Sequence, residues 1–137
     1  MKKVFWLILI VCFFCITTTV QAKQIKKVVF TPHEPTFKHQ ERVTIPLRNM
    51  TNDQEFSYYV VRAEQKDGDV WKQIRSDIGC PCQAECKKGP TLLASRRTRP
   101  IHWDQKDDQC AYVKPGTYRL NVKFVAFEQP SGSFVIE

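Results

Sequence analysis

The sequence predicts an all-β domain, an antiparallel sandwich of about seven short strands. Several segments alternate apolar and polar residues, a pattern typical of strands with one face on a core and one in water. Turn residues separate these segments at regular intervals. No amphipathic pattern with a period of 3.6 residues persists for ten residues, so no helix is expected. The clearest strand follows Pro115-Gly116, and its apolar residues share one face: Tyr118, Leu120, Val122 and Phe124.

The first half of the chain contains two predicted strands before residue 50. Residues 28–30 form the first one, and the two prolines in residues 31–35 end it, because proline fixes φ and lacks an N–H donor. Residues 42–48 alternate well, with Pro46 on the outward face. A proline inside such a run predicts an edge strand or a bulge. The inward residues of this strand are Val43, Ile45 and Leu47.

The next segment, residues 56–64, is apolar on both faces, which indicates a central strand. Asp67-Gly68 then predicts a hairpin, because this dipeptide suits the positive φ of tight turns, and residues 70–74 return. A cysteine-rich loop follows. Three further segments are predicted strands: 91–95, 98–103 and 133–136.

The N-terminus, residues 1–22, is predicted to be a secretory signal peptide. Lys2 and Lys3 precede an uncharged apolar run, and Ala22 ends a site suited to signal peptidase. The alternative is a retained membrane anchor, but the run is shorter than the ~20 residues that span a bilayer. We therefore expect a periplasmic or secreted protein, with no stable membrane insertion after cleavage.

The mature chain, residues 23–137, is predicted to be a single domain, since it is large enough for one core. Loss of Lys2 and Lys3 with the signal lowers the formal net charge from +7 to +5. This modest positive charge favours acidic partners. An exported protein seldom meets nucleic acid, so no nucleic-acid partner is expected.

Four of the six cysteines remain in the mature chain, and in an exported small domain they predict two disulfides. Four thiols allow three pairings. A Cys80–Cys82 bridge would close a strained ring around Pro81. The favoured pairings therefore join Cys110 to Cys80 or Cys82, with Cys86 closing a short local loop.

The alternative interpretation of these cysteines is a metal site. Cys80, Cys82 and Cys86 are soft ligands that could hold Cu(I) or Zn(II). Their spacing does not match the paired Cys-x-x-Cys of zinc sites, and export favours oxidation. Redox catalysis would require Cys-x-x-Cys at the start of a helix, which the sequence lacks. Structural disulfides are the prediction.

A basic cluster follows the cysteines and could recognise an anionic partner such as an acidic polysaccharide, a lipid headgroup or an acidic protein surface. The alternative is a solvated strand face opposite the aspartates of residues 104–108. These aspartates lack the glycine and the closing glutamate of a calcium loop. The basic residues are Lys87, Lys88, Arg96, Arg97 and Arg99.

No constellation of catalytic residues is evident, and neither an enzyme nor a cofactor is predicted. The sequence has no nucleophile-elbow, zinc-protease or phosphate-loop motif. The three histidines of the chain, His33, His39 and His102, are far apart and are interpreted as ordinary loop or surface residues. Trp71 and Trp103 are expected in the core.

A resemblance covers residues 98–137. A strand ending in Trp103-Asp104, a polar loop, and Pro115-Gly116-Thr117-Tyr118 before the next strand resemble bacterial immunoglobulin-like domains, including the intracellular proteinase-inhibitor-like family. The resemblance implies an immunoglobulin-like sandwich with Tyr118 as the corner tyrosine. Leu120 stands where an antibody-type domain would have cysteine. The inhibitor-like family is cytoplasmic, so no inhibitory residue is carried over.

Together these features predict an exported, non-enzymatic binding or structural module, stapled by disulfides, that presents loops to a protein or envelope partner. Inhibition of an extracytoplasmic hydrolase is one option within this class. The alternative function is copper or zinc handling through the Cys80, Cys82 and Cys86 cluster.

Overall fold

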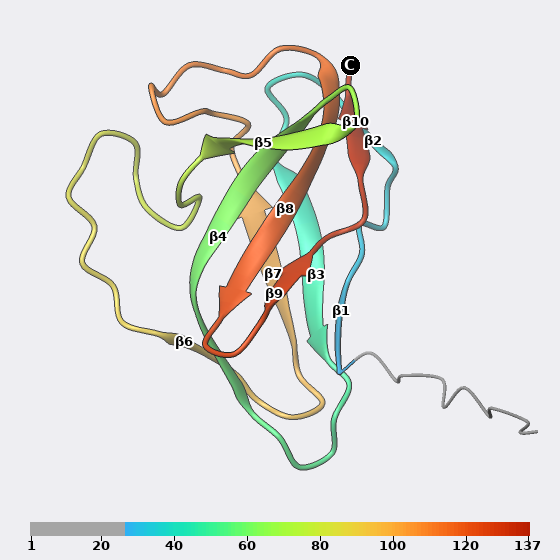
Figure 1. Cartoon of the computed structure of the whole chain (residues 1–137), viewed down its shortest axis with the longest axis vertical. Coiled ribbons are helices and arrows are strands. Elements are labelled where there is room, and N and C mark those ends of the chain that lie inside the picture. Colours follow the sequence, from blue (N-terminus) through green and yellow to red (C-terminus); the bar gives the residue numbers. More distant parts are fainter. Residues whose placement is uncertain (1–26) are drawn as a thin grey trace, which may run out of the picture.

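The fold is an all-β sandwich, as the sequence predicts. A computed structural model describes residues 27–137, which form ten strands and no helix (Figure 1). Within this range there is consequently no helix suited to crossing a membrane. The strands form two sheets, of three and seven strands, packed together. The predicted signal peptide, residues 1–22, lies outside the described residues.

The smaller sheet has the antiparallel order β1-β3-β7. Buried and exposed residues alternate along its central strand, as predicted. Its apolar side chains and those of Ile101 and Trp103 face the core between the sheets. The strands are β1 (Val28–Phe30), β3 (Val43–Asn49) and β7 (Thr98–Trp103).

The larger sheet has the order β2-β10-β8-β4-β5. In addition, β6 pairs with the first residues of β4, and β9 pairs with β8. Together with the smaller sheet, this order matches an immunoglobulin-like sandwich: β1, β3 and β7 take the places of strands A, B and E, and β4, β8 and β10 those of C, F and G. The strands are β2 (Thr36–Phe37), β4 (Phe56–Asp67), β5 (Val70–Arg75), β6 (Thr91–Leu93), β8 (Gly116–Phe124), β9 (Glu128–Pro130) and β10 (Phe134–Ile136).

The sequence pattern misses two strands, β2 and β9. Strand β2 has two residues and β9 has three, so neither is long enough to show a period of two. Strand β2 follows the prolines of residues 31–35 and pairs in parallel with β10. The sandwich is therefore not purely antiparallel, because long-range pairing with the last strand determines this segment.

The prediction that Pro46 marks an edge or a bulge holds only locally: there is no bulge and β3 is not an edge strand, but at Pro46 it has a neighbour on one side only. Strand β3 is central, and its register with β7 runs without a shift from Val43 to Arg48. Pro46 lies opposite Pro100. Residue pairs in antiparallel ladders alternate between two hydrogen bonds and none, and two prolines without N–H groups suit a position with none. On the other side of β3, the ladder with β1 ends at Leu47.

The core centres on an aromatic cluster at one end of the sandwich. The ring of Trp103 lies 5.7 Å from that of Tyr118 and 6.4 Å from that of Phe134. The Tyr118 hydroxyl donates a hydrogen bond to the Lys114 carbonyl, the arrangement expected of a corner tyrosine. The Trp103 indole N–H donates to the Lys106 carbonyl over 3.0 Å. Both aromatic residues therefore anchor the loop that joins β7 to β8.

The outer face of β8 is less exposed than its alternation predicts. Asn121 is 5% exposed and donates to the carboxylates of Glu64 and Glu128. Arg119 forms a 2.6 Å ion pair with Glu64 and lies 4.4 Å above the Trp71 ring. Trp71 is thus half-buried on the outside of the sheet and not in the core. Charged residues from β4 and β9 cover this face, which a single-strand pattern does not reveal.

Candidate functional site

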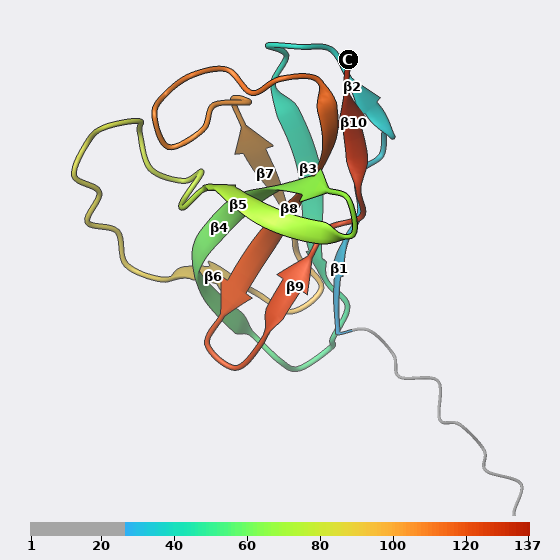
Figure 2. The same cartoon turned by 45° about the horizontal axis from the view of Figure 1, so that its top comes forward.

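Two long loops lie side by side in both views of the molecule: the cysteine loop, residues 76–90, and the β7–β8 loop, residues 104–115 (Figures 1 and 2). The Asp108 amide donates to the Ile74 carbonyl over 3.0 Å, and the Asp108 carboxylate accepts from the amide and hydroxyl of Ser76. Such long loops in a compact domain are uncommon and often carry function. We therefore take their joint surface as the candidate site.

A single buried side chain, Arg75, joins the two loops. It is the last residue of β5 and is 5% exposed. Its guanidinium donates to the Asp107 carbonyl of the β7–β8 loop over 2.7 Å. It also donates to the carbonyls of Cys80, over 2.7 Å, and Asp77, over 3.2 Å, and to the Cys82 sulfur. The planar fork of arginine suits such a set of acceptors.

Arg75 is held in its charged form. Burial alone disfavours the guanidinium charge, but the Cys82 sulfur and the carboxylates of Asp104 and Asp108 more than offset it and raise the pKa of Arg75 above its ordinary value. The cation therefore holds its carbonyl acceptors throughout the physiological pH range. Because these acceptors belong to both loops, neither loop can move far without breaking charge-assisted hydrogen bonds.

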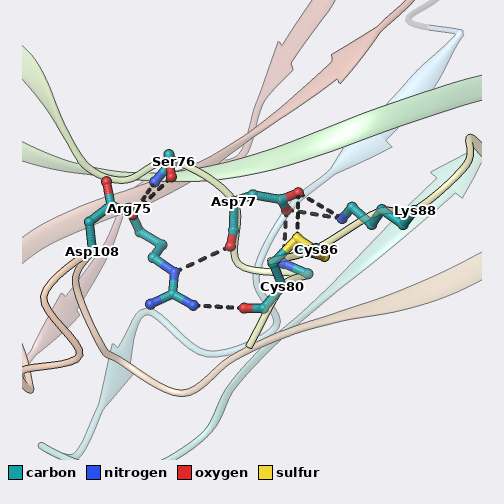
Figure 3. Close-up of a disulfide and its surroundings, with 8 residues drawn as sticks. Arg75, Ser76, Asp77, Cys80, Cys86, Lys88 and Asp108 are labelled. Carbon is teal, nitrogen blue, oxygen red and sulfur yellow. Dashed lines mark hydrogen bonds and ion pairs between the residues drawn. A yellow bond between two sulfur atoms is a disulfide. The ribbon is translucent and has the colours of Figure 1, made fainter. Parts of the chain in front are cut away.

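The Cys80–Cys86 disulfide closes the tip of the cysteine loop (Figure 3). The neighbouring Asp77 carboxylate accepts from the Gly79 amide over 2.9 Å and pairs with Lys88 Nζ at 3.0 Å. A side chain at position 79 would collide with Lys88 Nζ, so glycine leaves room for this pair. The predicted short local loop closed by Cys86 is confirmed, with Cys80 as its partner.

The other two cysteines, Cys82 and Cys110, are free thiols in this structure. One of the two predicted disulfides is thus present. The Cys82 sulfur lies against the β7–β8 loop, 3.9 Å from the Asp107 carbonyl oxygen. The remaining thiols therefore lie at the junction of the two loops.

The predicted alternative of copper or zinc binding would use Cys80, Cys82 and Cys86. Two of these three sulfurs are joined in the disulfide, so they are not thiolate ligands in this state. Among residues 27–137, no group of three or more histidine, cysteine or acidic side chains is arranged to hold a metal. Two of the three histidines form hydrogen bonds outside the cysteine loop: His39 with the Val113 carbonyl and His102 with the Thr44 hydroxyl.

A hollow of about 370 Å³ lies between the disulfide and the end of β5. Its walls are mainly polar and include the buried guanidinium, two carboxylates and the disulfide sulfurs. Such a surface suits the polar groups of a protein segment better than an apolar small molecule. The polar lining residues are Arg75, Ser76, Asp77, Gln83 and Asp108.

The predicted basic cluster consists of exposed residues, but the structure divides them among different surroundings: Lys87, Lys88, Arg96, Arg97 and Arg99. Lys88 pairs with Asp77 in the cysteine loop, whereas Arg96 donates to Asn52 in the loop that joins β3 to β4. The last two arginines line a separate hollow of about 320 Å³ beside β6 and β7. Only the two lysines belong to the candidate site.

Sequence reasoning misses two residues that build the site, Arg75 and Gln105. Gln105 is fully buried. Its side chain accepts from the Gln40 amide over 2.7 Å and donates to the Lys38 carbonyl over 2.8 Å, which anchors the base of the β7–β8 loop. Both residues lie in polar stretches, and their partners are backbone groups distant in the sequence. No local signal distinguishes them from exposed residues.

Neither a protein-family model nor a curated protein matches this chain. The resemblance to immunoglobulin-like and proteinase-inhibitor-like families thus stays a prediction. It depends on Trp103-Asp104 and Pro115-Gly116-Thr117-Tyr118.

Proposed function

We propose that this protein is an exported, non-enzymatic binding module that holds a protein or envelope partner on the joint surface of the cysteine loop and the β7–β8 loop. The observation that carries this proposal is the buried Arg75 guanidinium, which donates to backbone carbonyls of both loops. Loops held in one arrangement before binding lose less conformational entropy when a partner arrives. Inhibition of an extracytoplasmic hydrolase is one form this binding would take.

Two further features support the proposal. The Cys80–Cys86 disulfide agrees with an oxidising compartment, since such bonds persist mainly in exported proteins. The tip of the cysteine loop is exposed, including Glu85 and Lys87. A rigid base with exposed polar side chains on top is the usual arrangement of a binding loop.

The test is capture of a partner by the immobilised mature chain, residues 23–137, from the exported fraction of its own source. A charge swap, Glu85→Lys with Lys87→Glu, alters the loop tip, keeps the net charge and leaves the disulfide and Arg75 intact. A control swap, Asp53→Lys with Lys123→Glu, changes exposed residues outside both loops.

We expect the wild type and the control to hold the same identified partner at 1:1 stoichiometry, and the loop swap to bind it at least tenfold more weakly. Equal binding by all three proteins would contradict the assignment of the surface. Turnover of a hydrolase substrate by the pure protein would contradict the class. Copper or zinc retained by the natively exported protein would favour the metal-handling alternative.

A further inference from the structure

The two free thiols, Cys82 and Cys110, lie on different loops and both border the Asp107 carbonyl at the junction of the loops. The Asp107 carbonyl oxygen lies 3.9 Å from the Cys82 sulfur and accepts the Cys110 amide over 3.1 Å. The Cys82 sulfur and the Arg75 guanidinium are also the charged or polar neighbours that affect the pKa of the Cys110 thiol. The Gln83 side chain donates a hydrogen bond to the Gln109 carbonyl over 3.4 Å and so connects the same two segments. The contacts therefore bring the two cysteine-bearing segments together from different loops.

The turn that carries Cys110 is built to hold it there. The Asp107 carboxylate accepts from the amides of Gln109, over 2.9 Å, and Ala111, over 3.0 Å. Cys110 itself has a φ of 63°, in the left-handed region that favours glycine or asparagine. Local backbone preference therefore does not by itself favour a cysteine at this position.

The surroundings assign different roles to the two thiols. Arg75 donates to the Cys82 sulfur, so a positive charge lies beside this sulfur and stabilises the negative charge that it carries when it attacks a disulfide. The hydrogen bond with Cys82, together with desolvation, raises the pKa of the Cys110 thiol above its ordinary 9.0. Cys82 is thus suited to attack first, and Cys110 to resolve the mixed disulfide.

We propose that Cys82 and Cys110 are a redox pair that closes a second, reversible disulfide between the two loops, while Cys80–Cys86 remains the permanent bond. This assigns one pairing among those the sequence leaves open, and it does not depend on the proposed binding function. Closure fixes the cysteine loop covalently to the β7–β8 loop. Reduction leaves the junction to hydrogen bonds, those of Arg75, Ser76 and Gln83.

The oxidant is a disulfide, either of an exported oxidoreductase or of a small thiol such as glutathione. The Cys82 thiolate attacks one sulfur of glutathione disulfide, which forms a mixed disulfide and releases one glutathione thiolate. Cys110 then loses its proton to solvent and attacks the Cys82 sulfur, releasing the second glutathione. Two electrons pass from the cysteine pair to the oxidant, and the two thiol protons end on the two glutathiones.

Arg75 also determines which disulfide is reduced first. Its guanidinium lies beside the Cys82 sulfur and stabilises negative charge there, which only the reduced pair can carry; stabilising the reduced form makes a disulfide more oxidising. The sulfurs of Cys80 and Cys86 have no such cationic donor among the described hydrogen bonds. We therefore expect the Cys82–Cys110 bond to be reduced at glutathione ratios that leave Cys80–Cys86 intact.

The test equilibrates the folded mature chain in graded glutathione buffers, alkylates the free thiols and maps the linked peptides by mass. We expect two alkylated thiols, Cys82 and Cys110, in reducing buffers, and a linked 82–110 peptide in oxidising ones. Cys80–Cys86 should stay linked across this range. Two thiols that persist in oxidised glutathione, or a different pairing, would overturn the proposal.

Two kinds of variant separate a redox pair from accidental proximity. Arg75→Gln should make the 82–110 bond at least tenfold harder to reduce, equivalent to about 30 mV. If that variant does not fold, single-cysteine variants still decide: the Cys82 thiol of Cys110→Ser should react with a disulfide probe at least fivefold faster than the Cys110 thiol of Cys82→Ser. Equal rates would contradict the roles assigned to the two sulfurs.

Discussion

Replacement of Arg75 by lysine tests whether one side chain holds the two loops together. Lysine keeps the charge but lacks the planar fork, so it cannot reach the carbonyls of Asp77, Cys80 and Asp107 at once. A hydrogen bond from a charged donor contributes about 1.5–3 kcal/mol. Losing two of the three should reduce the free energy of local opening by about 3 kcal/mol, which corresponds to roughly a 150-fold change in the opening equilibrium.

The assay is native-state hydrogen exchange of amides that the loops protect. The Asp108 amide bonds to the Ile74 carbonyl and the Ile78 amide to the Val61 carbonyl, and both should exchange roughly 150-fold faster in Arg75→Lys. Amides of the β4–β8 ladder should keep their protection, because their opening requires global unfolding. The control is Arg96→Lys, at an exposed arginine, which should change exchange little.

A change of less than threefold at Asp108 and Ile78 would refute the assignment of Arg75 as the loop anchor. An equal loss of protection throughout the sandwich would also contradict a local role of Arg75 in anchoring the loops. It would show that Arg75 stabilises the whole domain and not the loops alone.

Three further predictions concern stability. Serine at both Cys80 and Cys86 should lower the free energy of unfolding by about 2–2.5 kcal/mol, since the bond closes a loop with a sequence separation of only 6; an unchanged urea midpoint would contradict this. Burial raises the pKa of Tyr118 above its ordinary 10.0, so the unfolded chain ionises first. The stabilisation this provides is complete below pH 10 and is lost as the pH rises through the folded-state pKa. Thermal melts above pH 10 should show this loss of stability, and Tyr118→Phe should reduce the pH dependence. At pH 7 the same variant should lower the free energy of unfolding by about 1 kcal/mol, because the Lys114 carbonyl loses its donor. Glu64→Gln should cost about 1.5–3 kcal/mol, because it leaves its arginine partner on β8 without a counter-ion; a denaturant midpoint within error of wild type would count against a structural role for that pair.

Local patterns predict most of the larger strands because burial imposes a period of two on any strand with one face on a core. The alternation of residues 116–124 places Tyr118 and Leu120 in the core, where the structure has them. Asp67-Gly68 likewise predicts the β4–β5 hairpin, and Gly68 has the positive φ that such a turn requires. These features depend on neighbours in the chain, so local sequence suffices.

The same patterns fail where long-range partners decide. Pro46 lies in a central strand, opposite a second proline and just beyond the end of the ladder with β1. Asn121 is buried because acidic residues of β4 and β9 reach it. Neither partner is close in the sequence, and an alternating pattern contains no information about what covers the outer face of a strand.

For the candidate site, the sequence by itself determined the number of cysteines, their position between two strands and the presence of a polar loop after Trp103. Only the tertiary structure decided that Cys80 pairs with Cys86, that Cys82 lies against the loop that carries Cys110, and that Arg75 joins the two loops. The physical reason is that these contacts link segments separated by up to 32 residues, and most of their acceptors are backbone carbonyls. Every residue type has a carbonyl, so only the folded path of the chain can select the ones that Arg75 binds.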